Sequence, residues 1–190
     1  ILQSHQKGCP FSDWAILYRT NAQSLTFESE FLHQKIPYQV VGSLKFYDRE
    51  EIKDLLAFLS LVANPKDELS FRRIINKPAR GIGNVAQDKI FASAITDDGL
   101  INLIDACKLS INNFSKKAKE EISMFISLMD ELNEKISSEN KELKLSEFIE
   151  LIMNKSGLLE HHKVQDEIAQ TQKVSNMQEL VNSAVLYDFS

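Results

Sequence analysis

The stretch "DREEIKDLLAFLSLVANP", residues 48–65, marks the point where the hydrophobic pattern of the chain changes. Acidic residues occupy its first turn and an Asn-Pro pair follows its last turn, which predicts one amphipathic helix between them. Its apolar residues recur at the helical period on one face: Ile52, Leu55, Leu56, Leu59 and Val62. Its charged residues should form a solvated face with weak ion pairs along the helix: Glu50, Glu51, Lys53 and Asp54.

Only helical patterns follow this stretch, and no later segment has the period of a strand. Further helices are predicted over 67–78, 84–95, 100–109, 115–136, 145–157 and 176–189, with a polar loop over 137–143. We therefore expect an all-helical domain over residues 67–190.

Before this stretch, short apolar runs over 13–19, 36–41 and 44–47 predict strands, and a helical pattern lies between the first two. Because this β-α-β order is typical of α/β sheets, residues 1–66 should form an incomplete α/β piece. The predicted fold class is mainly α, with a few strands before the helical domain. The chain begins at Ile1 rather than at Met and ends within a helical pattern, so we expect a piece of a longer protein.

The composition narrows the function classes. The 190 residues carry a net charge of −5 and are 43% hydrophobic, which is typical of a soluble globular protein and not of a generally basic nucleic-acid coat. The composition does not exclude a local basic site on this acidic protein. Two distant cysteines without a CxxC pattern give no support for a metal site. Since the sequence has neither a membrane-length apolar run nor a signal peptide, we expect a cytoplasmic protein without a membrane partner.

The stretch "NKPARGIGNV" places Gly81 and Gly83 directly before a predicted helix. Glycines leave the backbone bare, and Asn84 is of the type that caps a helix start. Free amides at a helix N-terminus form an anion site, and Lys77 and Arg80 would add positive charge beside it. Two interpretations follow: a helix–hairpin–helix-like turn that holds a nucleic-acid phosphate, or a tight helix–helix connection in which the glycines only reverse the chain.

The stretch "LYRTNAQS" places Arg19 and Asn21 directly after a predicted buried strand. Open α/β folds bind ligands at this carboxyl edge of the sheet, and both side chains can contact the phosphates and bases of a single strand. The alternative is a helix start with a solvated arginine, capped by Asn21 or Ser24.

Other candidate residues favour structural interpretations. Phe46 and Tyr47 could stack on bases, but core packing is the favoured role. His161 and His162 are neighbours that point to different sides of a helix, and no third ligand completes the spacing of a metal site. The sequence also lacks a P-loop, a GxGxxG motif and any catalytic constellation, so we predict no catalytic, cofactor-binding or metal-binding residue in this chain.

The order of these motifs resembles that of one family. "AILYRTNAQS", followed by "IPYQVVGSLKFYDREEIKDLLAFLSLVANPKDELSFRRIINKPARGIG", is similar to the UvrD/PcrA/Rep family of superfamily 1 DNA helicases. The likeness runs from about residue 13 to residue 84 and is only helical in character beyond that point.

The resemblance implies that residues 1–66 are part of the RecA-like motor domain 2A and that residues 67–190 are most of the inserted helical domain 2B. It implies a parent that is an ATP-dependent 3′-to-5′ DNA helicase of repair or replication, with repair or replication proteins as further partners. The parent would use ATP and Mg²⁺ through motifs that this chain lacks, so the chain alone should be inactive.

The resemblance also implies site residues. Arg19 and Asn21 match the motif that contacts single-stranded DNA. The turn matches the element with which 2B, a regulator of unwinding, holds duplex DNA: Arg80, Gly81, Ile82 and Gly83. Lys77 and Asn84 flank these residues and complete the predicted DNA-contacting set.

Three departures from the family pattern bear on DNA affinity. Leu25 stands where an arginine is common, the acidic pair Asp97–Asp98 follows the turn, and no hydroxyl residue comes shortly after Gly83. Two other function classes stay open: a helical adaptor that docks partner proteins without a motor, and a subunit of a helicase–nuclease.

Overall fold

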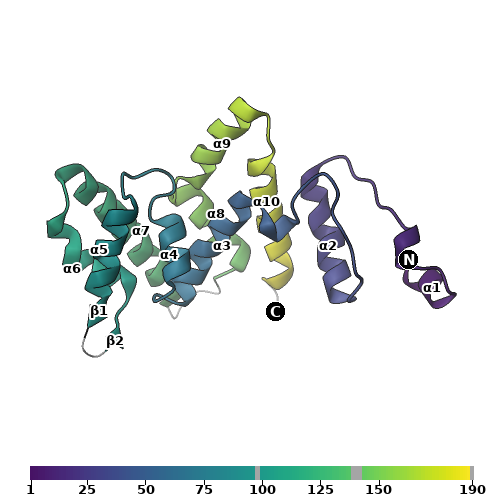
Figure 1. Cartoon of the computed structure of the whole chain (residues 1–190), viewed down its shortest axis with the longest axis horizontal. Helices are drawn as coiled ribbons and strands as arrows, with labels where there is room; N and C mark the ends of the chain where they lie inside the picture. The colour runs from purple at the N-terminus through teal and green to yellow at the C-terminus, as the bar shows by residue number, and fades with distance from the viewer. Residues whose placement is uncertain (97–98, 138–142, 189–190) are drawn as a thin grey trace.

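The computed structural model describes residues 1–96, 99–137 and 143–188 and shows an elongated, mainly helical molecule (Figure 1), which confirms the predicted fold class. The α-helices are α1 (Leu2–Gln6), α2 (Ser24–His33), α3 (Glu50–Ala63), α4 (Glu68–Ile74), α5 (Asn84–Ala94), α6 (Leu103–Ser110), α7 (Lys116–Ser137), α8 (Leu145–Lys155), α9 (Leu158–Ala169) and α10 (Lys173–Ala184). Residues 138–142 of the predicted polar loop and the pair Asp97–Asp98 lie outside the described residues.

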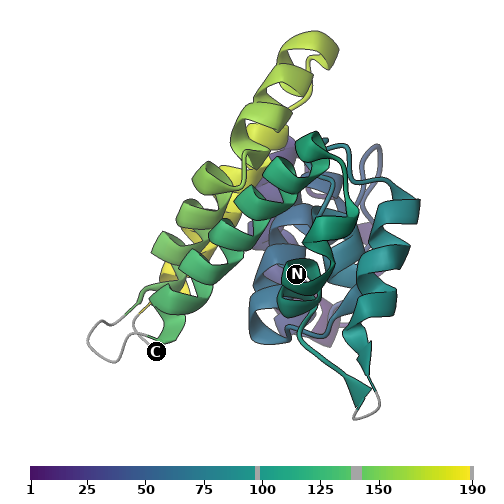
Figure 2. The same ribbon diagram turned by 90° about the vertical axis from the view of Figure 1, so that its left-hand side faces the viewer.

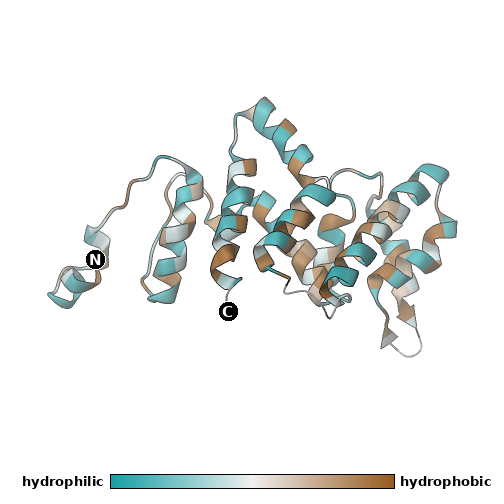
Figure 3. Cartoon of the chain, turned by 180° about the vertical axis from the view of Figure 1, so that it is seen from behind, coloured by the Kyte–Doolittle hydropathy of each residue, from teal (hydrophilic) through white to brown (hydrophobic). Residues whose placement is uncertain are grey.

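Helix α3 lies at the centre of the helical unit, as its sequence pattern predicts. Ile52, Leu55 and Phe58 are fully buried, and the helix packs against α4, α7, α8 and α10. Its apolar face belongs to one continuous hydrophobic core that extends from Leu25 to Ala184. Figure 3 shows hydrophobic residues where these central helices meet. The boundary between residues 66 and 67 stays a prediction.

The other predicted helices form at the expected places, and elements that were not predicted appear as well. Gly157 adopts a left-handed conformation (φ 81°) and separates α8 from an additional helix, α9, which projects from the unit in Figure 2. Strands β1 (Ile95–Thr96) and β2 (Gly99–Leu100) pair antiparallel beyond α5. The prediction that no strand follows α3 is therefore wrong.

The N-terminal part differs most from the prediction. The segments over 13–19, 36–41 and 44–47 form no strands, and residues 46–48 form a 3₁₀ turn instead. Leu17 is 95% exposed, so the first segment is not the buried strand that its apolar residues indicate. A strand is stable only when a neighbour satisfies its backbone groups, and no described segment pairs with these three.

Candidate nucleic-acid interface

The turn between α4 and α5 exposes two glycines and buries the residue between them. Gly81 (φ 71°) and Gly83 are exposed, whereas Ile82 is fully buried. The buried side chain of Gln87 donates from Nε2 to the Ile82 carbonyl, 2.9 Å away. Apart from the glycine itself and its two chain neighbours, no described residue has an atom within 4 Å of the place where either glycine would carry a Cβ. The turn therefore has a bare outer edge on an anchored centre.

The start of α5 has no side-chain cap. Gly83 is its N-cap residue and Asn84 its first helical residue, so the prediction that Asn84 caps the helix is wrong. The Gly83 carbonyl accepts the amides of Ala86 and Gln87. The exposed residues at positions 83–85 have amides without a hydrogen-bond partner among the described residues. Unpaired amides at a helix start favour an anionic ligand.

The Arg80 side chain turns inward and is half-buried. Nη1 donates to the carbonyls of Ile74 and Lys77, each at 2.9 Å, and Nη2 donates to the carbonyl of Ser156 at 2.9 Å. The guanidinium lies 5.7 Å from the centroid of the Phe125 ring, and burial lowers the Arg80 pKa. The expectation of a free positive charge here is wrong, because helix-end carbonyls offer acceptors that an arginine fork matches.

Asn76 closes the turn from within, a role that the sequence analysis missed. Its Oδ1 accepts the amides of Arg80 at 2.8 Å and Ile82 at 3.1 Å. Asparagine side chains often bond to nearby backbone in turns, so the Asn-x-Pro sequence at residues 76–78 carried a usable signal.

Lys77 is also engaged inside the molecule and adds no free charge beside the turn. Its ammonium contacts the carboxylate of Glu50 and lies 2.7 Å from Oδ2 of Asp54. Arg73 donates to Oδ1 of the same aspartate at 2.8 Å. Asp54 is fully buried and Glu51 is 3% exposed. The predicted solvated face of α3 is therefore wrong at these two positions, because neighbouring helices enclose them.

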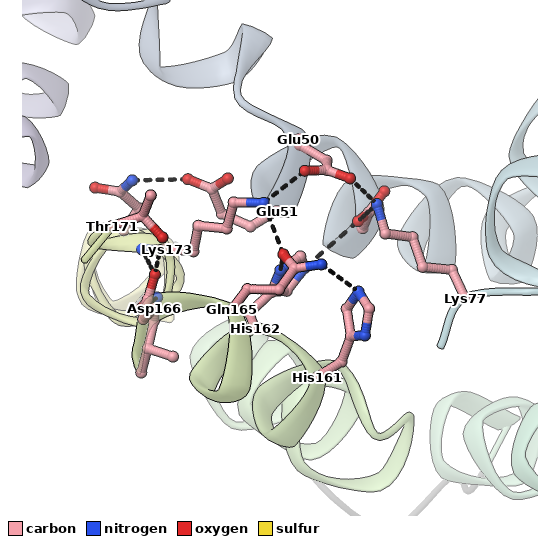
Figure 4. Close-up of polar contacts among 12 residues, drawn as sticks. Glu50, Glu51, Lys77, His161, His162, Gln165, Asp166, Thr171 and Lys173 are labelled. Atoms are coloured by element: carbon pink, nitrogen blue, oxygen red, sulfur yellow. Dashed lines mark hydrogen bonds and ion pairs between the residues drawn. The ribbon is translucent and has the colours of Figure 1, made fainter. Parts of the chain in front are cut away.

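Helices α9 and α10 complete this polar network (Figure 4). Nε2 of His162 lies 3.5 Å from Oδ2 of Asp54. Gln165 Oε1 accepts from Lys173 Nζ at 2.8 Å and lies 3.2 Å from His162 Nδ1. Since the lysine can only donate, the glutamine oxygen must face it, and the Nδ1 of His162 then donates to the same oxygen.

The network shifts the pKa values of its carboxyl groups. Hydrogen bonds from Lys173 and Lys77 lower the pKa of Glu50 to about 2. Burial acts to raise the pKa of Asp54, but the contacts from His162 and Lys77 outweigh it, so this pKa lies below its ordinary value. Both groups therefore favour the ionised form in the folded chain.

Arg19 and Asn21 have a different environment, since both are exposed. Gln23 Oε1 accepts the amides of Arg19 at 2.9 Å and Thr20 at 3.1 Å. Thr20 is the N-cap of the 3₁₀ turn Asn21–Gln23 that leads into α2, so the prediction that Asn21 or Ser24 caps this start is wrong. The Arg19 guanidinium makes no hydrogen bond or ion pair within the described residues.

Arg19 and Asn21 line a groove of about 570 Å³, whose other wall includes residues 170–173. Buried Arg49 lies in this groove and joins its two sides: Nη2 donates to Ser24 Oγ at 2.8 Å and Nη1 to Asn176 Oδ1 at 3.1 Å. None of residues 80–85, the turn before α5, lines this groove. The structure thus places Arg19 and Asn21 in one groove, and this groove does not include the turn.

Phe46 and Tyr47 differ in burial. Phe46 is fully buried, as its core interpretation predicts, whereas Tyr47 is 40% exposed, so the core interpretation is wrong for Tyr47. The Tyr47 ring lies edge-on to that of Phe46, with 5.4 Å between the ring centroids. No cluster of three His, Cys, Asp or Glu side chains that could hold a metal ion occurs among the described residues. Within the same residues, no helix combines the length and the apolarity needed to cross a membrane.

Comparison with known proteins extends the likeness beyond residue 84. The model of the UvrD-like helicase C-terminal domain family matches residues 1–189. The ATP-dependent DNA helicases PcrA of Staphylococcus epidermidis and Staphylococcus aureus are 37% and 35% identical to this chain over 183 residues. Each alignment covers 96% of this chain and 24% of the relative. The chain therefore spans about a quarter of the length of these curated relatives.

Proposed function

Because this chain belongs to the family of UvrD-like helicase C-terminal domains, we propose that it is a segment of an ATP-dependent 3′-to-5′ DNA helicase, with residues 1–66 in domain 2A and 67–190 in domain 2B. The likeness to ATP-dependent DNA helicases supports this proposal over an adaptor without a motor. ATP and Mg²⁺ bind to other parts of the cytoplasmic parent, so the segment alone does not hydrolyse ATP. Repair or replication proteins are the proposed partners.

The segment's own role in this proposal is to hold DNA and thereby regulate unwinding. The glycine turn, defined as residues 80–85, receives a phosphate of the duplex backbone. The observation that carries this role is that the exposed residues 83–85 have amides without a hydrogen-bond partner among the described residues. They lie beside two glycines at which a Cβ would have open space. A phosphate oxygen can accept these amides without meeting a side chain. The contact reads no base and is therefore independent of sequence.

Arg19 and Asn21 supply the second proposed contact, with single-stranded DNA. The exposed guanidinium of Arg19 has no competing partner among the described residues, so it can pair with a phosphate or stack on a base. Because the groove also holds exposed polar residues at 170–172, the strand meets hydrogen-bonding groups on both sides.

Gly83→Asp tests the turn with a matched neutral control, Gly83→Asn. The position has φ −73° and open space, so both residues fit without strain. At an N-cap either side chain satisfies helix amides, and we expect stability to rise by a few tenths of a kcal/mol. The aspartate also repels phosphate, so duplex affinity should fall about tenfold further than with asparagine. Fluorescence anisotropy of a labelled tailed duplex measures affinity, and thermal unfolding measures stability.

Equal duplex affinity for the chain and both variants would remove the phosphate role from the glycine turn. A joint loss of stability and affinity in Gly83→Asp would contradict the open geometry of this position. The expected pattern, in which stability and affinity change in opposite directions, separates charge repulsion from unfolding.

A further inference from the structure

The contacts behind the glycine turn assign a role to the arginine that precedes it. We propose that Arg80 and Asn76 are positioning residues, which hold the turn from inside while neither side chain touches the nucleic acid. This inference rests on the proposed function, since it concerns the same phosphate contact. In this proposal the charge of Arg80 stabilises the fold of the turn and does not contact DNA.

Arg80 joins the carboxyl ends of two helices that are far apart in sequence. Ile74 is the last residue of α4, and Ser156 is the C-cap of α8, 76 residues beyond Arg80. The carbonyls at a helix end carry partial negative charge, which a guanidinium complements. Because the fork already donates to these carbonyls and covers the Phe125 ring, a phosphate contact would require breaking several hydrogen bonds of 2.9 Å.

Asn76 orders the backbone of the same turn. By accepting the amides of Arg80 and Ile82, its Oδ1 directs both inward. The fully buried Ile82 side chain fixes the centre of the turn in the core. The backbone at Gly81 and Gly83 is consequently left on the outer side, where the unpaired amides lie.

The junction between α8 and α9 supports the turn from the other side. Ser156 offers its carbonyl to Arg80, and Gly157 packs against Pro78 so closely that a Cβ would lie 3.3 Å from Pro78 Cγ. The left-handed φ of 81° at Gly157 is one that other residues rarely adopt. The packing of α8 and α9 therefore determines where the turn sits.

Salt dependence separates a positioning arginine from a phosphate-binding one. The logarithm of the binding constant falls with the logarithm of the salt concentration, and losing one direct phosphate contact makes this slope less steep by about 0.9 on duplex DNA. Removing a positioning residue lowers the affinity and leaves the slope unchanged. We expect Arg80→Gln to lower duplex affinity about tenfold with the original slope. Arg80→Lys keeps the charge but loses the forked guanidinium, so its duplex affinity should fall by about the same factor.

Asn76→Ala provides a second arm without any change of charge. It should lower duplex affinity, again with the slope unchanged, and speed hydrogen exchange at the Ile82 amide. This arm decides the proposal if the Arg80 variants do not fold. Lys117→Gln on α7, at an exposed position, shows what the loss of one positive charge elsewhere on the chain does to affinity and slope.

Two results would overturn the proposal. One is a slope that falls by about 0.9 in Arg80→Gln and stays unchanged in Arg80→Lys, which would mark a direct phosphate contact. The other is an Asn76→Ala variant with the original affinity. Both differ from failure of the proposed function itself, in which Gly83→Asp and Gly83→Asn bind duplex as tightly as the unchanged chain.

Discussion

The glycine turn and the segment around residues 19–23 look alike in sequence, since each places an arginine shortly before a helix. In the structure their arginines have different surroundings. Arg80 donates to helix-end carbonyls and lies over an aromatic ring, whereas the side chain of Arg19 is exposed and has no partner among the described residues. A motif therefore locates a binding element, while the surrounding fold decides which groups of that element face the ligand.

The two regions also differ in what lies beneath them. Beneath the turn, Lys77 forms an ion pair with the buried carboxylate of Asp54. Near Arg19 the chain runs through the exposed segment that contains Leu17. Substitutions of the inward-bonded side chains of the first region, Arg80 and Asn76, should therefore lower stability and binding together. Substitution of Arg19 in the second region should change binding alone.

Asp54→Asn should have the largest effect on stability and would sharpen this contrast. It leaves Lys77 and Arg73 without their buried carboxylate, and breaking a buried ion pair from one side typically costs about 3 kcal/mol. Urea denaturation measures the loss. Asp48→Asn is the matched control, because Asp48 is exposed and its one ion pair within the described residues is with Lys53 at 3.0 Å. The change in stability should stay within about 0.5 kcal/mol. Equal effects of the two substitutions would contradict the importance of the network.

Acid should weaken the network through Glu50. Its pKa falls from the ordinary value of 4.5 to about 2 on folding, so the folded chain binds this proton less readily than the unfolded chain. The resulting stability is fully present above about pH 4.5 and is lost as the pH falls toward 2. Asp54 acts in the same direction. Because the Glu50 side chain is 48% exposed, we expect its share to be at most about 1 kcal/mol.

Urea midpoints at about pH 5 and about pH 3 measure this dependence. Glu50→Gln should make the fall in stability between these two conditions smaller. Glu134→Gln, at an exposed position on α7, should leave it as it is. An equally steep fall in the Glu50 variant would show that its ion pairs do not contribute.

Arg19→Ala should have the smallest effect on stability, below about 0.5 kcal/mol, because the Arg19 guanidinium has no partner to lose among the residues that the structure describes. Binding of a labelled single strand should nevertheless weaken, and its salt slope should fall by about 0.7, as expected for one lost phosphate contact. This is the reverse of the pattern expected for Arg80. A large loss of stability, or an unchanged slope, would contradict the proposed difference in role between Arg19 and Arg80.

Local patterns predicted the helical part well because a helix is specified by its own residues. The period of apolar residues in α3 and the glycines before α5 were sufficient to place these elements. Helix α9 follows Gly157 without a clear apolar stripe. Strands β1 and β2 have two residues each, too few to show an alternating pattern. The predicted N-terminal strands failed because a strand needs a partner that its own sequence does not supply.

By itself, the sequence determined the helices, the bare glycine turn and the family resemblance, since these depend on spacings within short stretches. Only the tertiary structure decided that Asp54 is buried, that Arg80 points inward and that Asn76 closes the turn. The physical reason is distance along the chain: the Ser156 carbonyl lies 76 residues from Arg80, and Asn176 lies 127 residues from Arg49. Such partners meet only when the helices pack, so burial and hydrogen bonding are set by folding rather than by any local pattern.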